Sequence, residues 1–77
     1  MVEPVLSKRL AQVAQFIPIG CRLADIGTDH AYLPVHLALA GKISSAIATD
    51  INEGPVQAAR ANVEKYQLQS VIDVRQG

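Results

Sequence analysis

Acidic residues and a glycine follow directly after two short apolar segments of the chain. Residues 22–34 read RLADIGTDHAYLP, and they place Gly27 and Asp29 just past the segment LADI, while Asp50 ends the apolar segment ISSAIAT. A carboxylate accepts charge-assisted hydrogen bonds from amines and hydroxyls. Glycine lets the backbone approach a ligand closely or adopt a positive φ. This combination predicts a binding site for a small polar ligand.

A site for phosphate groups is disfavoured. A dinucleotide-binding motif G-x-G-x-x-G that began at Gly27 would need glycine where Asp29 and Tyr32 stand. A carboxylate about 4 Å from a pyrophosphate charge would be repelled by roughly 4 kcal/mol at an effective dielectric near 20. A P-loop is absent too, because Ile43 follows Gly-Lys and His36 occupies the position of the first glycine.

A cofactor that carries positive charge and no phosphate fits these residues better. S-adenosylmethionine has an amino group, a sulfonium and a ribose diol. Asp25 or Asp29 could accept hydrogen bonds from its amino group, and Asp50 stands where cofactor-binding α/β domains place the acid that binds the ribose. Simpler alternatives remain: Asp29 could cap a helix, and residues 50–52 could form a capped turn between strand and helix.

Other single residues carry weaker signals. His30, at a strand end, is a better site candidate than His36, and no third ligand at a suitable spacing joins them, so no metal site is expected. Cys21 is expected to pack as a small hydrophobic residue. Phe16 and Tyr66 are predicted to lie in the core or at its rim.

The composition is that of a soluble globular protein. The 77 residues carry no net charge, 49% are hydrophobic, and there is a single cysteine. Neutral charge argues against this segment binding nucleic acid alone, and one cysteine excludes an internal disulfide. No apolar run is long enough for a membrane span, and the interrupted N-terminal residues do not resemble a signal peptide. The expected location is the cytoplasm.

Hydrophobic periodicity predicts alternating helices and strands. The first predicted elements are a helix at about 5–17 with Leu6, Leu10, Val13 and Ile17 on one face, a strand at 21–26 and a helix at 34–40 followed by Gly41. A strand at 43–50 follows, then a helix capped by Asn52 with Val56, Ala59, Val63 and either Tyr66 or Gln67 on one face, and a strand at 71–75. This order predicts an α/β fold with parallel strands, half of a doubly wound sheet. We therefore expect residues 1–77 to form a partial Rossmann-like domain that stops before a fourth strand and whose open sheet edge could self-associate.

Three stretches together resemble a known family. LSKRLAQVAQFIPIGCRLADIGTDHAYLP, then GKISSAIATDINEGPVQAARANVEKYQL, then IDVRQG are similar to the start of the bacterial tRNA (adenine-22-N1)-methyltransferase family, the TrmK family. DIGTDHAYLP following SKRL is the most specific part. The resemblance covers the chain from about Leu6 to Gly77, and it implies a class I methyltransferase domain that binds S-adenosylmethionine and acts on tRNA in the full-length protein.

The resemblance also implies roles for particular residues. The loop that would wrap the methionine part of the cofactor comprises Asp25, Gly27, Thr28, Asp29 and His30. Asp50 and Ile51 would contact ribose and adenine, and Gly77 would begin a further cofactor turn. Arg9 would touch cofactor or a tRNA phosphate. No catalytic residue is assigned, because the residues that contact the target adenine are expected beyond this chain, which alone is expected to be inactive.

Two alternatives to this function stay open. The chain could be a non-catalytic half-Rossmann module that folds by self-association. It could also belong to a class I methyltransferase with a different substrate.

Overall fold

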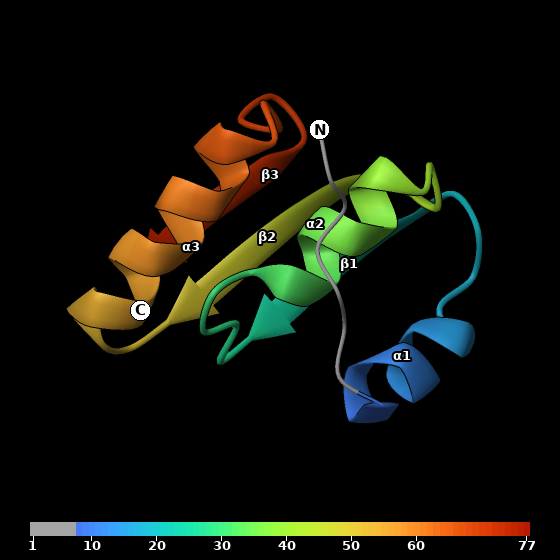
Figure 1. Cartoon of the computed structure of the whole chain (residues 1–77), viewed down its shortest axis with the longest axis horizontal. Coiled ribbons are helices and arrows are strands. Elements are labelled where there is room, and N and C mark those ends of the chain that lie inside the picture. The colour runs from blue at the N-terminus through green and yellow to red at the C-terminus, as the bar shows by residue number, and fades with distance from the viewer. Residues whose placement is uncertain (1–7) are drawn as a thin grey trace.

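Residues 8–77, the part of the chain that the computed structural model describes, form a three-stranded sheet with helices packed against it (Figure 1). The element order matches the prediction: α1 (Lys8–Gln15), β1 (Cys21–Ile26), α2 (Tyr32–Leu39), β2 (Ile43–Asp50), α3 (Glu53–Lys65) and β3 (Ile72–Gln76). Leu6 and the start of the predicted helix at 5–17 lie outside the described residues, and the helix ends at Gln15.

All three strands are parallel, with β2 in the centre and β1 and β3 on either side of it. Ile26 at the end of β1 lies opposite Thr49, and Gln76 at the end of β3 lies opposite Asp50. Parallel pairing therefore brings the segments that follow β1 and β2, and the end of β3, together at the carboxyl-terminal end of the sheet. Open α/β sheets bind their ligands at this end.

Helices α2 and α3 cover one face of this sheet (Figure 1). Successive strand residues point to opposite faces, so Ala48 and Val74 are buried under the helices while Ile47 on the other face remains 40% exposed. Arg22 and Asp73 are also exposed on that other face. Among the described residues the sheet thus has one covered and one open face.

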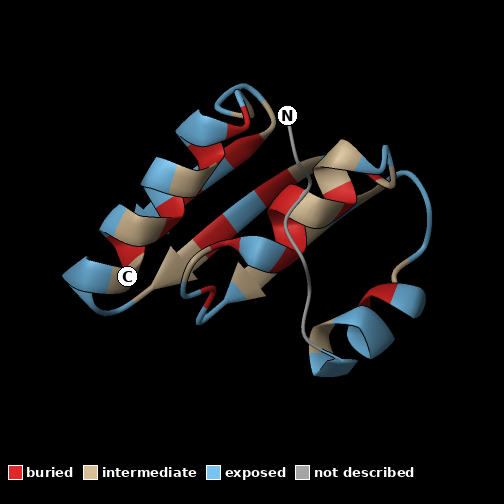
Figure 2. Ribbon diagram, viewed as in Figure 1, coloured by how far each residue is buried: buried red, intermediate tan, exposed pale blue. Residues whose placement is uncertain are grey.

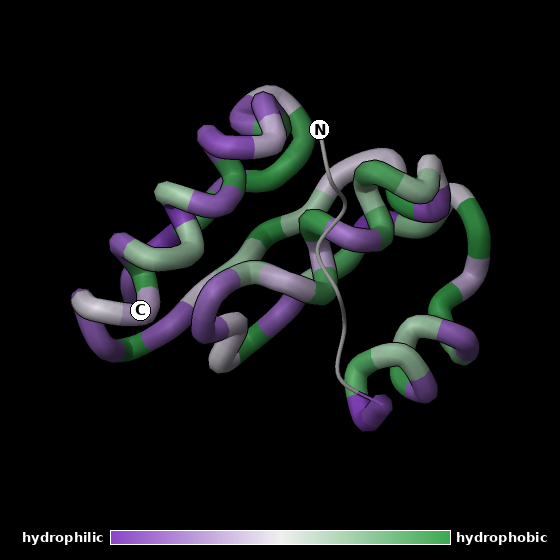
Figure 3. Tube along the Cα trace, viewed as in Figure 1, coloured by the Kyte–Doolittle hydropathy of each residue, from purple (hydrophilic) through white to green (hydrophobic). Residues whose placement is uncertain are grey.

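The core lies between the helices and the covered face (Figure 2). Its fully buried side chains include Val35 and Leu37 of α2 and Val56 of α3. The predicted apolar face of α3 is confirmed, because Val56, Ala59, Val63 and Tyr66 are all buried. In Figure 3 the apolar positions of α3 alternate along the helix with hydrophilic ones, which is the pattern of a helix with one side against a core.

Local details differ from the sequence predictions at a few positions. The second helix begins at Tyr32 rather than at residue 34, although Pro34 lies in its first turn and Gly41 follows it with a φ of +70°, as expected. The third strand is shifted to Ile72–Gln76. Phe16 was expected in the core or at its rim, which is wrong: α1 ends before it and its side chain is 85% exposed.

Candidate functional site

The loop between β1 and α2 has an unusual backbone. Gly27, Asp29 and Ala31 adopt left-handed conformations, with φ values of +72°, +58° and +60°. Residues other than glycine rarely take this conformation, and such residues concentrate at functional sites, where the surrounding structure holds them in place. Ala31 occupies the N-cap position of α2 and no side chain caps that helix, so the alternative in which Asp29 is the N-cap is wrong.

Gly27 opens this loop toward solvent. No heavy atom lies within 4 Å of the position that a Cβ would take there. Glycine is needed at this point for the positive φ rather than for space.

Asp25 and Thr28 hold the loop in shape. The hydroxyl of Thr28 donates a hydrogen bond of 2.7 Å to Asp25 Oδ2, and the Thr28 N–H donates one of 2.9 Å to the carbonyl of Thr49 on β2. Thr28 is only 8% exposed. Both residues stand where the sequence placed them in the site, but their side chains are directed at each other.

Asp29 and His30 present the exposed polar groups of the loop. Their side chains are 68% and 44% exposed, and Asp29 Oδ1 lies 3.1 Å from His30 Nδ1, at hydrogen-bonding distance but without the alignment of a hydrogen bond. The His30 ring stacks on Tyr32, with centroids 5.1 Å apart and planes 5° from parallel. The amide of Asn62 donates a hydrogen bond of 2.8 Å to the His30 carbonyl.

Sequence reasoning missed Tyr32 and Asn62. For Tyr32 a signal existed, because an aromatic residue stands two positions after the histidine of the loop. Asn62 gave a weaker one: it is a polar residue directly before Val63 on the buried side of α3. Nothing in the linear pattern shows that its partner would be His30, which lies 32 residues earlier.

A second group of site residues gathers where β2 ends, beside β3. Asp50 Oδ1 accepts a hydrogen bond of 3.0 Å from the N–H of Asn52, and the Asp50 carbonyl accepts one of 2.9 Å from Gly77. The amide of Gln76 donates to the carbonyl of Ile51 at 3.3 Å, and the Ile51 side chain is 76% exposed. Asn52 takes the predicted N-cap position of α3, but its side chain makes no capping hydrogen bond.

The site residues that were predicted after β1 and after β2 therefore lie at the carboxyl-terminal end of the sheet, together with Gly77. Arg9 stands apart: it is exposed on α1, and its side chain forms no hydrogen bond or ion pair within the described part of the chain. Within residues 8–77 no three His, Cys, Asp or Glu side chains gather as a possible metal site, and no helix is both long and apolar enough to cross a membrane.

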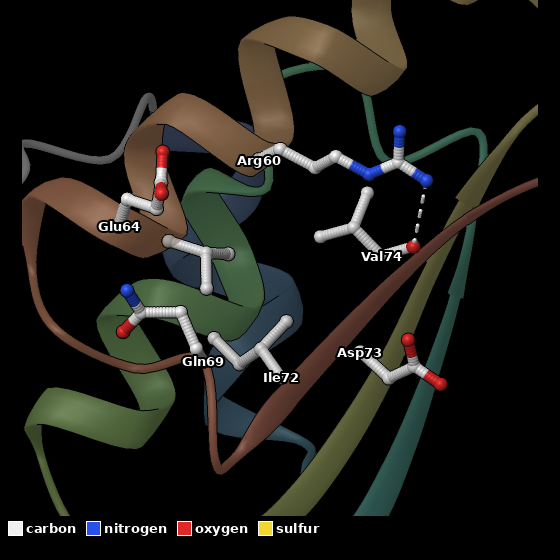
Figure 4. Close-up of a pocket in the computed structure, with 7 residues that line it drawn as sticks. Arg60, Glu64, Gln69, Ile72, Asp73 and Val74 are labelled. Atoms are coloured by element: carbon white, nitrogen blue, oxygen red, sulfur yellow. Dashed lines mark hydrogen bonds between the residues drawn. The ribbon is translucent and has the colours of Figure 1, made fainter.

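A cavity of about 340 Å³ lies elsewhere, between α3 and β3 (Figure 4). Arg60 extends across it and donates a hydrogen bond of 3.4 Å to the carbonyl of Val74. The residues lining it are Arg60, Val63, Glu64, Gln69, Ile72, Asp73 and Val74. None of them is a predicted site residue, so this cavity is separate from the candidate site.

Parallel strands in this order, with acidic residues and an open glycine at their carboxyl ends, define a Rossmann-like domain of the cofactor-binding class. A family model described as a methyltransferase domain matches residues 6–77, and the chain belongs to that family.

Individual relatives agree with this assignment. The chain is 54% identical over 77 residues to the tRNA (adenine(22)-N(1))-methyltransferase of Bacillus subtilis (strain 168), covering all of this chain and 32% of that protein. The resemblance to the tRNA (adenine-22-N1)-methyltransferase family is thus confirmed. The chain spans about a third of the length of this relative.

Two solved structures superpose closely on this chain. A protein of the NADB-Rossmann superfamily from Streptococcus agalactiae has a TM-score of 0.95 and 47% identity, covering 99% of this chain and 34% of that one. TrmK of M. capricolum, in complex with S-adenosyl-homocysteine, has a TM-score of 0.91 and 46% identity, covering 96% and 33%. The α/β fold with parallel strands that the sequence predicts is confirmed.

Proposed function

We propose that this chain is the cofactor-binding portion of an S-adenosylmethionine-dependent methyltransferase that methylates N1 of an adenine in tRNA. The observation that carries the proposal is the 54% identity to a tRNA (adenine(22)-N(1))-methyltransferase across the whole chain. The relative in complex with S-adenosyl-homocysteine supports the choice of cofactor. The expected cellular location is the cytoplasm, where unmodified tRNA is available.

The residues present fit this cofactor. The carboxylate of Asp50 has one oxygen bound to the Asn52 N–H, and its other oxygen can accept from a ribose hydroxyl. Exposed Ile51 offers an apolar surface to the adenine ring. Asp29 can accept from the amino group of the methionine part, and the space over Gly27 admits that part close to the backbone.

The remaining predicted residues have supporting roles in the proposal. Asp25 and Thr28 keep the β1–α2 loop in the conformation that presents Asp29 and His30. Gly77 binds the carbonyl of Asp50 and so holds the end of β3 beside the ribose site. Arg9 is proposed to contact a phosphate of tRNA, which its exposed position permits.

Chemistry in this class is transfer of the methyl group that the sulfonium of the bound cofactor supplies. This chain contributes binding and orientation, which can account for a large part of the barrier reduction when two reactants are held in line. We assign no catalytic residue to it. Substrate tRNA and the transfer step involve the whole protein and remain part of the proposal.

Calorimetry with S-adenosyl-homocysteine tests the cofactor site. Asp50→Asn and Asp29→Asn each remove one charge-assisted hydrogen bond, and we expect each to weaken binding by about tenfold to 100-fold. Asp73→Asn is the matched control, because Asp73 is an exposed acid on the open face of the sheet that pairs with Arg75. Equal affinity in all three variants would show that the residue assignments are wrong.

One observation favours a second function, that of a non-catalytic module which self-associates. Ile26 is 85% exposed at the end of β1, on the open face that also exposes Ile47. Sedimentation of the chain distinguishes the two: a discrete folded dimer without affinity for S-adenosyl-homocysteine would favour the module. A methyltransferase with another substrate would instead bind the cofactor, and the whole protein would not distinguish unmodified tRNA from tRNA that lacks the target adenine.

A further inference from the structure

The rings of His30 and Tyr32 stack on each other beside the candidate site, and the outer face of this stack is an aromatic surface. Their centroids are 5.1 Å apart and their planes differ by 5°. The His30 side chain is 44% exposed and Tyr32 is 41% exposed, so neither ring is a core residue. Two aromatic rings held parallel at the surface resemble the platforms on which proteins stack nucleic-acid bases.

This surface is held in place from two directions. Asn62 on α3 donates a hydrogen bond of 2.8 Å to the main-chain carbonyl of His30. Tyr32 is the first residue of α2, so its backbone is set by the helix. An exposed surface that is oriented this firmly costs little further ordering when a ligand binds.

Its position separates it from the part of the site that would hold the adenosine of the cofactor. Asp50 and Ile51 follow the central strand β2, whereas His30 and Tyr32 follow β1, which lies at an edge of the sheet. Under the proposed function, the methionine part of the cofactor lies along the β1 loop, and the methyl group is delivered near that loop. The aromatic surface is then next to the place where the acceptor must enter.

We propose that the His30–Tyr32 surface receives the acceptor adenine by stacking. This inference rests on the proposed function and adds to it a position for the base. In the transfer, the lone pair of N1 forms the new N–C bond, the C–S bond breaks, and its electron pair returns to sulfur. The positive charge passes from sulfur to the adenine ring.

The surroundings of the platform suit that charge. An aromatic face attracts a cation through its quadrupole, and the attraction grows as the base becomes charged. The Asp29 carboxylate, 68% exposed and adjacent to the His30 ring, adds a negative charge on the same side of the loop. Tyr32 is therefore a specificity residue of this proposal, with no role in holding the cofactor.

The test uses the 77-residue chain and nuclear magnetic resonance of its aromatic rings, which are few: two tyrosines, one phenylalanine and two histidines. The probe is 1-methyladenosine, the cationic nucleoside of the product, added to chain saturated with S-adenosyl-homocysteine. We expect upfield ring-current shifts at Tyr32 and His30, while buried Tyr66 stays unshifted. Ribose, which lacks a base, is the control ligand and is expected to shift neither ring.

Two variants separate stacking from a merely structural role. Tyr32→Phe keeps the ring and is expected to keep the binding, whereas Tyr32→Leu is expected to weaken it by about fivefold to 150-fold, the range for one base stacked on an aromatic ring. Affinity for S-adenosyl-homocysteine should stay within about twofold in both variants, which also shows that both are folded.

The proposal is overturned if 1-methyladenosine shifts neither ring, or if Tyr32→Leu binds it as well as the original chain does. These results with intact cofactor binding would leave the proposed function standing. Failure of the chain to bind S-adenosyl-homocysteine would count against the proposed function instead. In that case the ring shifts that 1-methyladenosine causes without S-adenosyl-homocysteine decide whether the base stacks on His30 and Tyr32.

Discussion

The side-chain amide of Asn62 donates a hydrogen bond of 2.8 Å to the main-chain carbonyl of His30, and so joins α3 to the loop after β1 across 32 positions of sequence. It is a direct contact between the second crossover helix and the loop that carries exposed Asp29. Loops are the parts of a fold that open most easily, and a side-chain bond from a packed helix limits that opening.

Asn62→Ala is expected to lower the free energy of unfolding by about 1 kcal/mol, because the carbonyl of His30 loses its donor. It should also weaken S-adenosyl-homocysteine binding severalfold, since the loop becomes less ordered before binding. Urea unfolding and calorimetry measure the two effects. Gln57→Ala on the same helix is the control and should change neither, because exposed Gln57 donates a hydrogen bond of 3.1 Å to exposed Glu53, away from the loop.

Replacing Thr28 tests the internal bond of the loop. Thr28→Val keeps the shape of the side chain but leaves Asp25 Oδ2 without its 2.7 Å donor, and we expect a loss of stability of about 1 to 2 kcal/mol. Thr28→Ser retains the hydroxyl and should lose less. A chemical denaturation curve for each variant decides this, and equal losses would show that packing, rather than the hydroxyl, matters at this position.

Gly27 is expected to be sensitive through its backbone rather than through crowding. Its φ of +72° is unfavourable for a residue with a Cβ, although no atom lies within 4 Å of the Cβ position. Gly27→Ala should therefore cost about 1 to 2 kcal/mol of stability, and Gly27→Asn less, because asparagine tolerates this conformation better. Thermal unfolding of both variants is the measurement, and the reverse ranking would contradict the argument.

Leu37 and Phe16 are both large hydrophobic residues on or beside helices, yet their environments are opposite. Leu37 is fully buried and Phe16 is 85% exposed. Leu37→Ala should cost about 2 to 5 kcal/mol, because it removes core contacts and leaves a cavity. Phe16→Ala should stay within about 0.5 kcal/mol of the original chain. Circular dichroism during urea titration compares them, and similar losses of stability would contradict the exposed position of Phe16.

By itself the sequence determined the elements and the residue types of the site. The strands Cys21–Ile26 and Ile43–Asp50 match their predictions, and the buried face of α3 is the predicted one. These features depend on periodicities of two or about four residues, which burial of one face imposes on neighbouring positions. The acids and the glycine at the strand ends, and the absence of a phosphate-binding motif, follow directly from the order of residue types along the chain.

The tertiary structure alone decided which of those residues meet. The central position of β2, the bond from Asn62 to His30, and the cavity under Arg60 depend on sheet register and on how helices pack across it. Contacts between positions some thirty residues apart leave no periodic trace, because either partner satisfies its local pattern without the other. The exposure of Phe16 likewise depends on tertiary packing, because the residue lies just past the end of α1 and no other element covers it in the described part of the chain.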